Sequence, residues 1–345
     1  MGSKQVGSAL VAGVLVVGLV AVVDAVRSGD AGERPRNEQE RARGDDTLGG
    51  LAAKLRTEGI HGVLYYSDPE DDCRLHARRL PTLDETPPSE LRACRFELPP
   101  DPTYGLTPTQ VAWHPTIHLR AACLEDRVVV STVAGEPIAR IQGCAPAWKP
   151  DGTLTAVRNG EVWCVRTPSN DACERRLLAT AELTRAAHAV NFVPTGPRYI
   201  RSVSAIRVAW LGEKRSAALI RVRLRGRLRS VGPITVLAVY DGRHLLRTTQ
   251  YAGAFDLRMS PRRSFIGIID AGGQVAIVTR GGEQLLGAGD LPAPETHAVA
   301  WSPDERWTAV ATRWSVYLLP TADVDAGRQP RIIRLPLAAR DLAWR

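Results

Sequence analysis

The chain has 345 residues, of which 44% are hydrophobic and 24% are charged, and this composition excludes collagen-like, low-complexity and wholly disordered proteins. The formal net charge is +8, and nearly all of the 45 basic residues are arginine. A chain of this length forms one large domain or two to three small ones.

The first predicted element is an apolar run at residues 9–23, which extends to Val26 if Asp24 is tolerated at a membrane interface. Fifteen residues in a helix span roughly 22 Å, less than the ~30 Å hydrocarbon core, and the apolar part of a signal peptide also reaches about 15 residues. Residues 1–26 are therefore predicted to be an uncleaved membrane anchor. A signal peptide cleaved after Ala25 and a buried core helix are the alternatives.

The next two segments lead into the main domain. Residues 27–46 combine dense mixed charge with no apolar periodicity, which predicts a solvated tether, and residues 47–58 predict one short amphipathic helix. Arginines flank the apolar run on this side, and the positive-inside rule would then keep the main domain in the cytoplasm. We give the cysteines described below more weight, because large domains cross membranes largely regardless of flanking charge.

The strongest pattern is a repeat that begins at Ala145, Phe255 and Ala298. Each unit has an apolar alternating stretch, a large residue, a proline-containing turn and two further β-rich runs. The large residues two positions before the proline are Leu98, Trp148, Phe192, Met259 and Trp301. Trp113 and Trp210 are interpreted as secondary matches inside irregular units. Spacings of about 40–50 residues with four strands per unit are typical of β-propellers.

The two ends of the repeat region predict how the ring closes. The chain finishes with the strand DLAWR, which matches the start of a unit but has no hairpin after it. The strands near Gly62 and Cys73 have no such strand before them. We therefore expect residues 59–345 to form an all-β, six-bladed β-propeller that is closed by its C-terminal strand, which leaves no exposed sheet edge at the junction.

These units, WKPDG at Trp148 and WSPDE at Trp301 in particular, resemble the TolB-type, WD-like propeller repeat of bacterial envelope proteins. The resemblance covers residues 60–345 and implies a propeller in the cell envelope. TolB-type proteins carry a separate domain ahead of the propeller, whereas this chain has only the tether and the short helix there. The resemblance therefore implies no particular partner.

All six cysteines lie between residues 73 and 173. The interval from Cys73 to Cys94 and the interval from Cys123 to Cys144 are both 21 residues, which places the two pairs at equivalent positions of successive blades. A third pair would cross a single hairpin. The spacing favours three disulfides and an oxidising, extracytoplasmic compartment, with metal binding and free buried thiols as the alternatives. The expected pairs are Cys73–Cys94, Cys123–Cys144 and Cys164–Cys173.

No nucleophile, phosphate-loop, dinucleotide or zinc-protease motif is present, so no catalytic residue, cofactor or metal ligand is expected. His114 and His118 are four residues apart but flank a strand turn, and the acidic run at residues 68–72 lacks the glycine of a calcium loop. Among the predicted innermost strands, only Asn191 and Asp256 are polar candidates. An enzyme of the lactonase or cyclase kind, with its site in the central funnel, is therefore the alternative and not the main prediction.

One strand concentrates positive charge on a single face, because arginine occupies every second position. The five residues are Arg221, Arg223, Arg225, Arg227 and Arg229. This strip is either a solvated outer strand that resists edge pairing or a docking surface for an anionic partner.

The sequence therefore predicts a single-pass membrane protein whose extracytoplasmic propeller is a binding or assembly module. Cleavage and secretion, and a scaffold on the cytoplasmic side, are the alternatives. The expected partner is a protein or an anionic envelope component, such as a lipid headgroup or an acidic polymer, and nucleic acid is not expected.

Overall fold

The computed structural model divides the chain into two compact units, residues 1–51 and residues 52–345. It describes residues 48–86, 92–97, 107–108, 111–116, 118–132, 134–167, 173–190, 200–224, 234–251, 253–254, 256–269, 275–286, 296–326 and 331–345. The predicted anchor and tether lie outside the described residues, as do Leu98, Asn191 and Phe192. None of the helices in the described part of the chain is long and apolar enough to cross a membrane.

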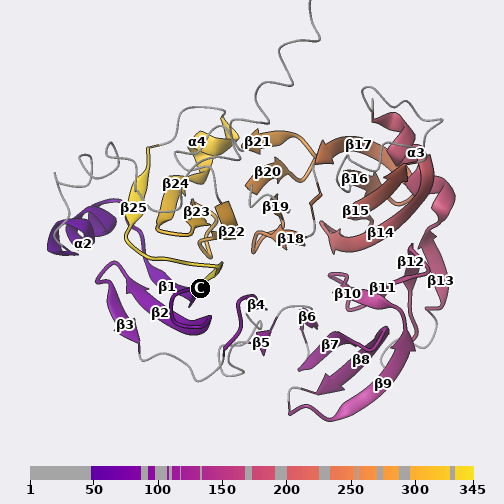
Figure 1. The fold of residues 1–345 in the computed structure, drawn as a ribbon, viewed down its shortest axis with the longest axis horizontal. Coiled ribbons are helices and arrows are strands. Elements are labelled where there is room, and N and C mark those ends of the chain that lie inside the picture. The colour runs from indigo at the N-terminus through magenta and orange to yellow at the C-terminus, as the bar shows by residue number, and fades with distance from the viewer. Residues whose placement is uncertain are drawn as a thin grey trace, which may run out of the picture. The chain divides into compact units, whose positions relative to one another are not determined.

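Six four-stranded antiparallel sheets form the framework of the described part of the second unit (Figure 1). The first sheet has the order β26-β1-β2-β3, with the bounds Asp341–Trp344, Gly62–Asp68, Arg74–Leu80 and Asp84–Thr86. The second sheet contains β6 Val111–Trp113, β7 Leu119–Leu124, β8 Arg127–Thr132 and β9 Pro137–Gln142. The third sheet contains β10 Cys144–Trp148, β11 Leu154–Arg158, β12 Glu161–Cys164 and β13 Arg175–Leu178.

The remaining three sheets also follow chain order. The fourth contains β14 Ile200–Trp210, β15 Arg215–Leu224, β16 Ile234–Asp241 and β17 His244–Tyr251. The fifth contains β18 Asp256–Met259, β19 Phe265–Ile269, β20 Val275–Thr279 and β21 Gln284–Leu286. The sixth contains β22 Thr296–Trp301, β23 Trp307–Thr312, β24 Val316–Pro320 and β25 Ile333–Leu335. A short pair, β4 Phe96–Glu97 and β5 Thr107–Pro108, and three helices, α2 Leu48–Thr57, α3 Thr180–Ala189 and α4 Thr321–Asp325, complete the described elements.

The sheets pack face to face, and this packing explains their sequences. Separate apolar clusters lie between the second and third sheets, the third and fourth, the fourth and fifth, and the fifth and sixth. A strand that is covered on both faces reads as a continuous apolar run instead of an alternating one. Residues 234–240 of β16 are accordingly all buried, and so is the whole of β23. The helix α3 adds Leu183, Ala186 and Ala187 to the cluster between the third and fourth sheets.

The turn that follows each innermost strand recurs five times with the same hydrogen bond, in which the first residue of the turn donates its backbone N–H across the turn. The bonded pairs are His114–Leu119 at 3.0 Å, Lys149–Thr153 at 2.9 Å, Leu211–Arg215 at 2.9 Å, Ser260–Phe265 at 3.1 Å and Ser302–Trp307 at 2.9 Å. The repeat is therefore structural, and Trp148, Met259 and Trp301 end innermost strands as the sequence predicts.

The interpretation of Trp113 and Trp210 as secondary matches is wrong. Trp113 ends β6 and Trp210 ends β14, so both are full equivalents of Trp148. The proline that marked the other units is not required, because Leu211 opens an equivalent turn with glycine in place of proline. What the units share is the small apolar stretch before the large residue, as in VAW at Trp113 and Trp210.

Indole groups at these positions tie neighbouring sheets together. Nε1 of Trp148 donates to the carbonyl oxygen of Ala112 in the second sheet at 2.9 Å, and Nε1 of Trp210 donates to Oγ1 of Thr155 in the third sheet at 2.9 Å. A buried Trp N–H needs such a partner, because an unmade hydrogen bond costs about 1–3 kcal/mol. Trp148 and Trp210 thus pack as apolar wedges and also link their sheets to the preceding sheet by a hydrogen bond.

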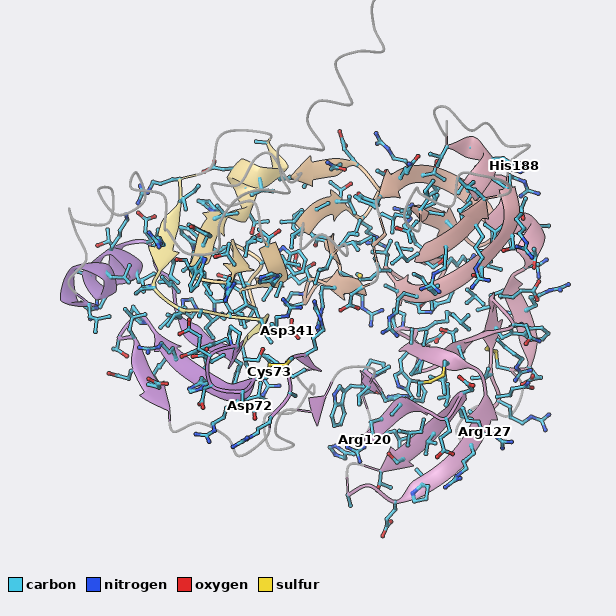
Figure 2. The ribbon with its side chains drawn as sticks, viewed as in Figure 1. Asp72, Cys73, Arg120, Arg127, His188 and Asp341 are labelled. Atoms are coloured by element: carbon cyan, nitrogen blue, oxygen red, sulfur yellow. A yellow bond between two sulfur atoms is a disulfide. The ribbon has the colours of Figure 1, made fainter. Side chains whose placement is uncertain are left out.

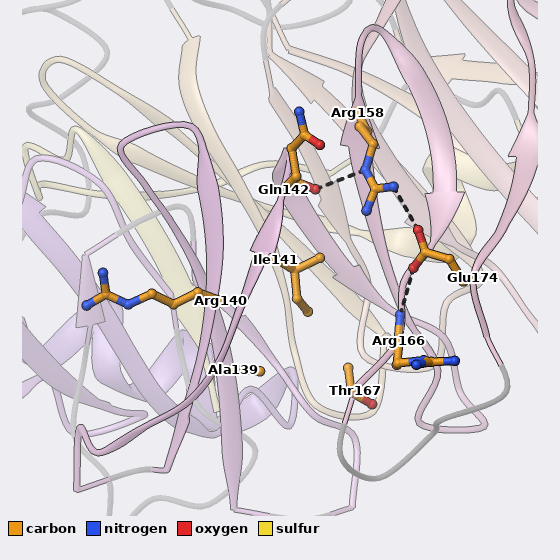
Figure 3. A pocket seen from close by; sticks show the side chains of 8 residues that line it. All are labelled: Ala139, Arg140, Ile141, Gln142, Arg158, Arg166, Thr167 and Glu174. Carbon is orange, nitrogen blue, oxygen red and sulfur yellow. Dashed lines mark hydrogen bonds and ion pairs between the residues drawn. The ribbon is translucent and has the colours of Figure 1, made fainter.

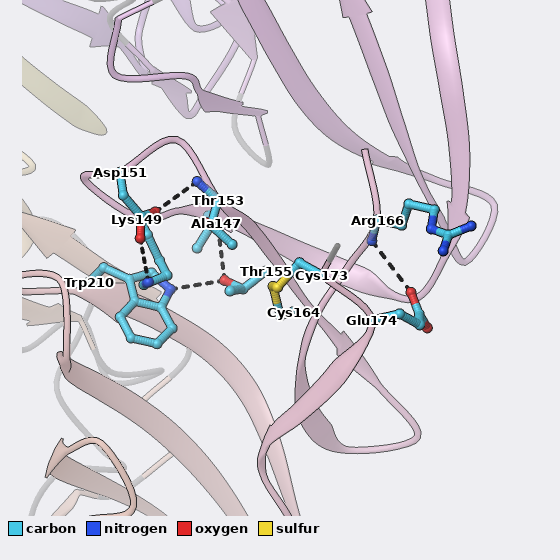
Figure 4. The surroundings of a disulfide bond; sticks show 10 residues. All are labelled: Ala147, Lys149, Asp151, Thr153, Thr155, Cys164, Arg166, Cys173, Glu174 and Trp210. Atoms are coloured by element: carbon cyan, nitrogen blue, oxygen red, sulfur yellow. Dashed lines mark hydrogen bonds and ion pairs between the residues drawn. A yellow bond between two sulfur atoms is a disulfide. The ribbon is translucent and has the colours of Figure 1, made fainter. Parts of the chain in front are cut away.

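Three disulfides connect the first half of the chain (Figures 2 and 4), and their pairs are those that the spacing favours. The Cα atoms are 4.6 Å apart in Cys73–Cys94, 5.1 Å apart in Cys123–Cys144 and 5.6 Å apart in Cys164–Cys173. Cys123 lies on β7 and Cys144 begins β10, so this bond joins the second sheet to the third. Cys164 ends β12 and Cys173 precedes β13, so this bond crosses one hairpin. Three disulfides fit an extracytoplasmic location.

Candidate functional site

The innermost strands of all six sheets line one central cavity of about 590 Å³. These strands are β6, β10, β14, β18, β22 and β26. Five tryptophans contribute to its wall, namely Trp113, Trp148, Trp210, Trp301 and Trp344. A concave, mostly apolar volume of about 300–1,000 Å³ with a few polar groups is the usual form of a small-molecule site.

Three charged residues in or beside the cavity share one position of the repeat. The residue three places before the large residue is Arg207 in β14, Asp256 in β18 and Asp341 in β26. The equivalent residues in β10 and β22 are alanines. Because the innermost strands converge, these three charged residues approach one another although they are far apart in the sequence.

Asp341, labelled in Figure 2, is the most buried charged group among the described residues. None of its surface is exposed, at 0%. Its Oδ2 accepts a hydrogen bond from Nη2 of Arg258 at 2.8 Å and another from the backbone N–H of Phe96 at 2.9 Å. Within the described part of the chain, Oδ1 of Asp341 has no hydrogen-bond partner. Burial raises the pKa of Asp341 despite the opposing charge of Arg258. These bonds connect β26 with β18 and β4.

Asp256 lies among three guanidinium groups. The nearest atoms are Nε of Arg258 at 3.4 Å, Nη1 of Arg95 at 3.8 Å and Nε of Arg207 at 3.9 Å from its carboxylate oxygens. All four side chains are largely withdrawn from solvent, with exposed fractions between 10% and 29%. Burial lowers the pKa of Arg95, and the neighbouring carboxylates of Asp341 and Asp256 counteract this.

We call these five residues, Arg95, Arg207, Asp256, Arg258 and Asp341, the central charge cluster. It holds three positive and two negative groups. Each carboxylate faces at least one guanidinium, which would repel a metal cation from the same oxygens. Across the described residues, no group of three or more histidine, cysteine, aspartate or glutamate side chains could hold a metal ion. The cluster is thus suited to attract an anion.

Two further cavities lie away from the centre. One of about 470 Å³ is lined by β9 and the third sheet, where Arg158 binds the carbonyl oxygen of Gln142 and the carboxylate of Glu174 (Figure 3). The other, of about 690 Å³, lies beside the Cys164–Cys173 disulfide. There Nζ of Lys149 is 2.6 Å from Asp151 and 5.5 Å from the centre of the Trp210 ring (Figure 4).

The predicted arginine strip is described only in part. Arg221 and Arg223 are exposed on β15, whereas Arg225, Arg227 and Arg229 lie outside the described residues. An outer-strand role is wrong for the described part, because β15 pairs with β14 on one side and β16 on the other. Its arginines therefore project from a fully paired strand and protect no sheet edge.

Neighbouring side chains contact both His114 and the acidic turn at residues 68–72. His114 is buried against Trp148, with ring centres 4.6 Å apart, and burial lowers its pKa. In the acidic turn, Asp71 is 3.1 Å from Nε2 of His76 and Asp72 is 2.6 Å from Nη1 of Arg92. Asp71 and Asp72 of the acidic turn are thus each engaged by a neighbouring side chain.

Six repeated four-stranded sheets whose innermost strands line one cavity define the β-propeller class. No family model and no curated protein matches the chain. Among solved structures, the hydrazine synthase of Kuenenia stuttgartiensis is similar with a TM-score of 0.42 and 13% identity, over 78% of this chain and 83% of that chain. Sqt1 of Saccharomyces cerevisiae has a TM-score of 0.39 and 9% identity, over 68% of this chain and 77% of that chain.

A third solved structure is the β-propeller domain of Cps50 (Swd1) from Myceliophteria thermophila. It is similar with a TM-score of 0.35 and 11% identity, over 68% of this chain and 89% of that chain. These similarities are too distant to transfer an activity. The assignment to the β-propeller class therefore rests on the repeated sheets and their common cavity.

Proposed function

We propose that this protein is a membrane-tethered, extracytoplasmic, six-bladed β-propeller that acts as a binding or assembly module. The observation that carries the proposal is the central cavity, to which every one of the six sheets contributes its innermost strand. A binding site of this kind is held rigidly by the scaffold and needs no catalytic group. The partner would be a protein or an anionic component of the envelope.

Pairing between the two ends of the repeat region supports a closed ring. β26 pairs with β1 from Leu64 opposite Trp344 to Ser67 opposite Asp341, and it also contacts β22 of the sixth sheet. One strand thereby bridges the first and the last sheets. Closure of this kind removes the exposed edges at which sheets otherwise aggregate.

The proposed location rests on three sequence and structural features. The apolar run at residues 9–23 is suited to anchor the chain, and residues 27–46 would separate the anchor from the propeller. The three disulfides are typical of proteins outside the cytoplasm. The resemblance of the repeats to TolB-type propellers also favours the envelope.

The charge cluster favours binding over catalysis in a funnel site. Funnel enzymes of the lactonase or cyclase kind need carboxylates that are free to hold a metal or transfer a proton. Here Oδ2 of Asp341 is held by Arg258 and by the Phe96 N–H, and Asp256 is surrounded by arginines. These contacts compensate the carboxylate charge.

Thiol trapping in the native cell tests the location. Cells that express the full chain are treated with a thiol-alkylating reagent before and after reduction, and the membrane and soluble fractions are compared. We expect no alkylated cysteine before reduction, six after reduction, and recovery in the membrane fraction. Six cysteines that react without reduction would instead support the scaffold on the cytoplasmic side.

Site-specific cross-linking tests the module. A photoreactive phenylalanine derivative replaces Trp113, which lines the cavity, or Leu246, which is 41% exposed on the outermost strand β17. We expect a discrete cross-linked partner from position 113 and none from position 246. The same products from both positions, or none from position 113, would contradict a binding role for the cavity.

A further inference from the structure

The central charge cluster carries one positive charge more than it can neutralise, because three arginines face two aspartates. Its side chains are at most 29% exposed, so solvent screens this excess only weakly. One monovalent anion would bring the cluster to neutrality. Deepening the function proposed above, we infer that the central cavity binds a small organic carboxylate that carries an aromatic or other apolar body.

Arg207 is the residue best placed to hold the carboxylate. It lines the cavity, its side chain is the most exposed of the three arginines, and its Nε is 3.9 Å from Asp256. That distance is beyond a hydrogen bond, and no group among the described residues accepts a hydrogen bond from the Arg207 side chain, so its donors are available to a ligand. Arg258 also lines the cavity and orients its Nη2 toward Asp341. A planar guanidinium matches a carboxylate with two parallel hydrogen bonds.

The apolar wall of the cavity favours a ligand whose carboxylate is attached to an aromatic group. Tryptophans from five sheets and Met259 from the remaining one line the same cavity as Arg207 and Arg258. A small inorganic anion would lose its hydration there and gain nothing from the indoles, whereas an aromatic ring gains contact with them. The site therefore favours a carboxylate on an aromatic body over free phosphate.

Two sources could supply this chemistry. One is a free aromatic acid, and the other is the C-terminal carboxylate of a peptide that ends in an aromatic residue. We use phenylacetate as the probe for the first source and a peptide ending in phenylalanine for the second. The neutral counterparts are phenylacetamide and the same peptide with an amidated C-terminus.

Calorimetric titration of the oxidised full chain in a non-ionic detergent measures the affinity for the probes of both sources and for their neutral counterparts. We expect at least one of the two carboxylates to bind at least tenfold more tightly than its neutral counterpart, with an affinity that falls as salt is added. The source that shows this difference is the class of ligand. Equal affinity of both carboxylates and both neutral counterparts, or binding by none of the four, would overturn the inference.

Arg207→Gln tests the role of the cavity arginine, and Arg215→Gln is its matched control. Arg215 lies on the adjacent strand, has a similar exposure of 34%, and is likewise 3.9 Å from its partner Asp241, but it does not line the cavity. We expect Arg207→Gln to weaken carboxylate binding at least tenfold and Arg215→Gln to leave it unchanged. Equal effects of the two variants would refute the assignment.

Asp256→Asn should have the opposite effect on carboxylate binding. This variant removes the carboxylate that competes for Arg207, so carboxylate binding should become severalfold tighter while the neutral counterpart is unaffected. Unchanged or weaker binding by a variant with wild-type thermal unfolding would contradict the inference.

The cross-linking at position 113 is independent of these titrations. A cross-linked partner together with no carboxylate preference would leave the binding module standing and remove only this ligand class.

Discussion

Replacing Arg258 by methionine should destabilise the protein by about 3 kcal/mol. The variant leaves the Asp341 carboxylate, which is fully buried, without its 2.8 Å charge partner, and the Phe96 N–H remains as its hydrogen-bond donor. Breaking a buried ion pair costs about 3–5 kcal/mol. Because the raised pKa of Asp341 lets this carboxyl take up a proton in the variant, we expect the lower end of this range.

Urea denaturation of the oxidised protein, followed by tryptophan fluorescence, measures this loss. Asp341→Asn combined with Arg258→Met should recover about 2 kcal/mol relative to Arg258→Met alone, because both buried charges are then absent. Arg215→Met is the control, since that guanidinium is 34% exposed and its pair with Asp241 should contribute less than about 1 kcal/mol. A loss below about 1 kcal/mol in Arg258→Met, or a double variant with the summed losses of the two single variants, would refute the reasoning.

The raised pKa of Asp341 also predicts a pH dependence of stability. Burial raises the pKa of Asp341 above its value in the unfolded chain, so the folded protein retains this proton to a higher pH. Its contribution to stability is therefore fully present below about pH 4 and is lost as the pH rises through the folded pKa. The difference in unfolding free energy between the wild type and Asp341→Asn should shift in this direction between acidic and neutral pH. A difference that stays constant, or moves the opposite way, would contradict the raised pKa.

Three further predictions concern other parts of the fold. Deleting residues 339–345 removes the innermost strand of the first sheet and should abolish cooperative unfolding, and an unchanged thermal transition would show that the strand is dispensable. Replacing Arg221 and Arg223 by glutamate should weaken binding of the anchor-free protein to anionic vesicles at least tenfold, because each basic residue contributes on the order of 1 kcal/mol near an acidic surface. Binding to neutral vesicles should not change. Gly267→Ala should cost about 1–3 kcal/mol because the new Cβ would overlap a valine of the sixth sheet, whereas Gly281→Ala, which meets only an ordinary contact, should stay within about 0.5 kcal/mol of the wild type in urea denaturation.

The repeating strands and turns can be predicted from the sequence, because each is determined by residues that are neighbours in the chain. An alternating apolar strand and a tight turn are encoded in about ten neighbouring residues, so Trp148, Met259 and Trp301 identify their strands directly. Trp210 is ranked too low when the proline of the turn receives more weight than the strand before it. Trp113 is followed by Pro115 and is ranked too low because Leu98 is taken as the marker of the same unit. Leu211 shows that the turn forms without that proline.

The central charge cluster cannot be predicted from neighbouring residues, because its members come from separate innermost strands and from the segment at β4. Asp256 is recognisable as a polar residue on an innermost strand, but its partners Arg95 and Arg207 are not. A signal does exist for part of the cluster. Aligning the units on Trp210, Met259 and Trp344 places Arg207, Asp256 and Asp341 at one repeat position, and innermost strands that converge bring such positions together. Arg95 and Arg258 have no such signal, and only the packed structure reveals their contacts.

The pairing of β26 with β1 sets an order of events for a growing chain. His61, next to β1, and Trp344 of β26 are hydrogen-bonded across a separation of 283 residues. At a synthesis rate of about 5–20 residues per second, the first sheet waits roughly 15–60 s for its innermost strand. During this interval the inner edge of β1 is open to any other extended segment. The first sheet, although made earliest, is therefore completed last, and until then its inner edge can pair with a wrong partner.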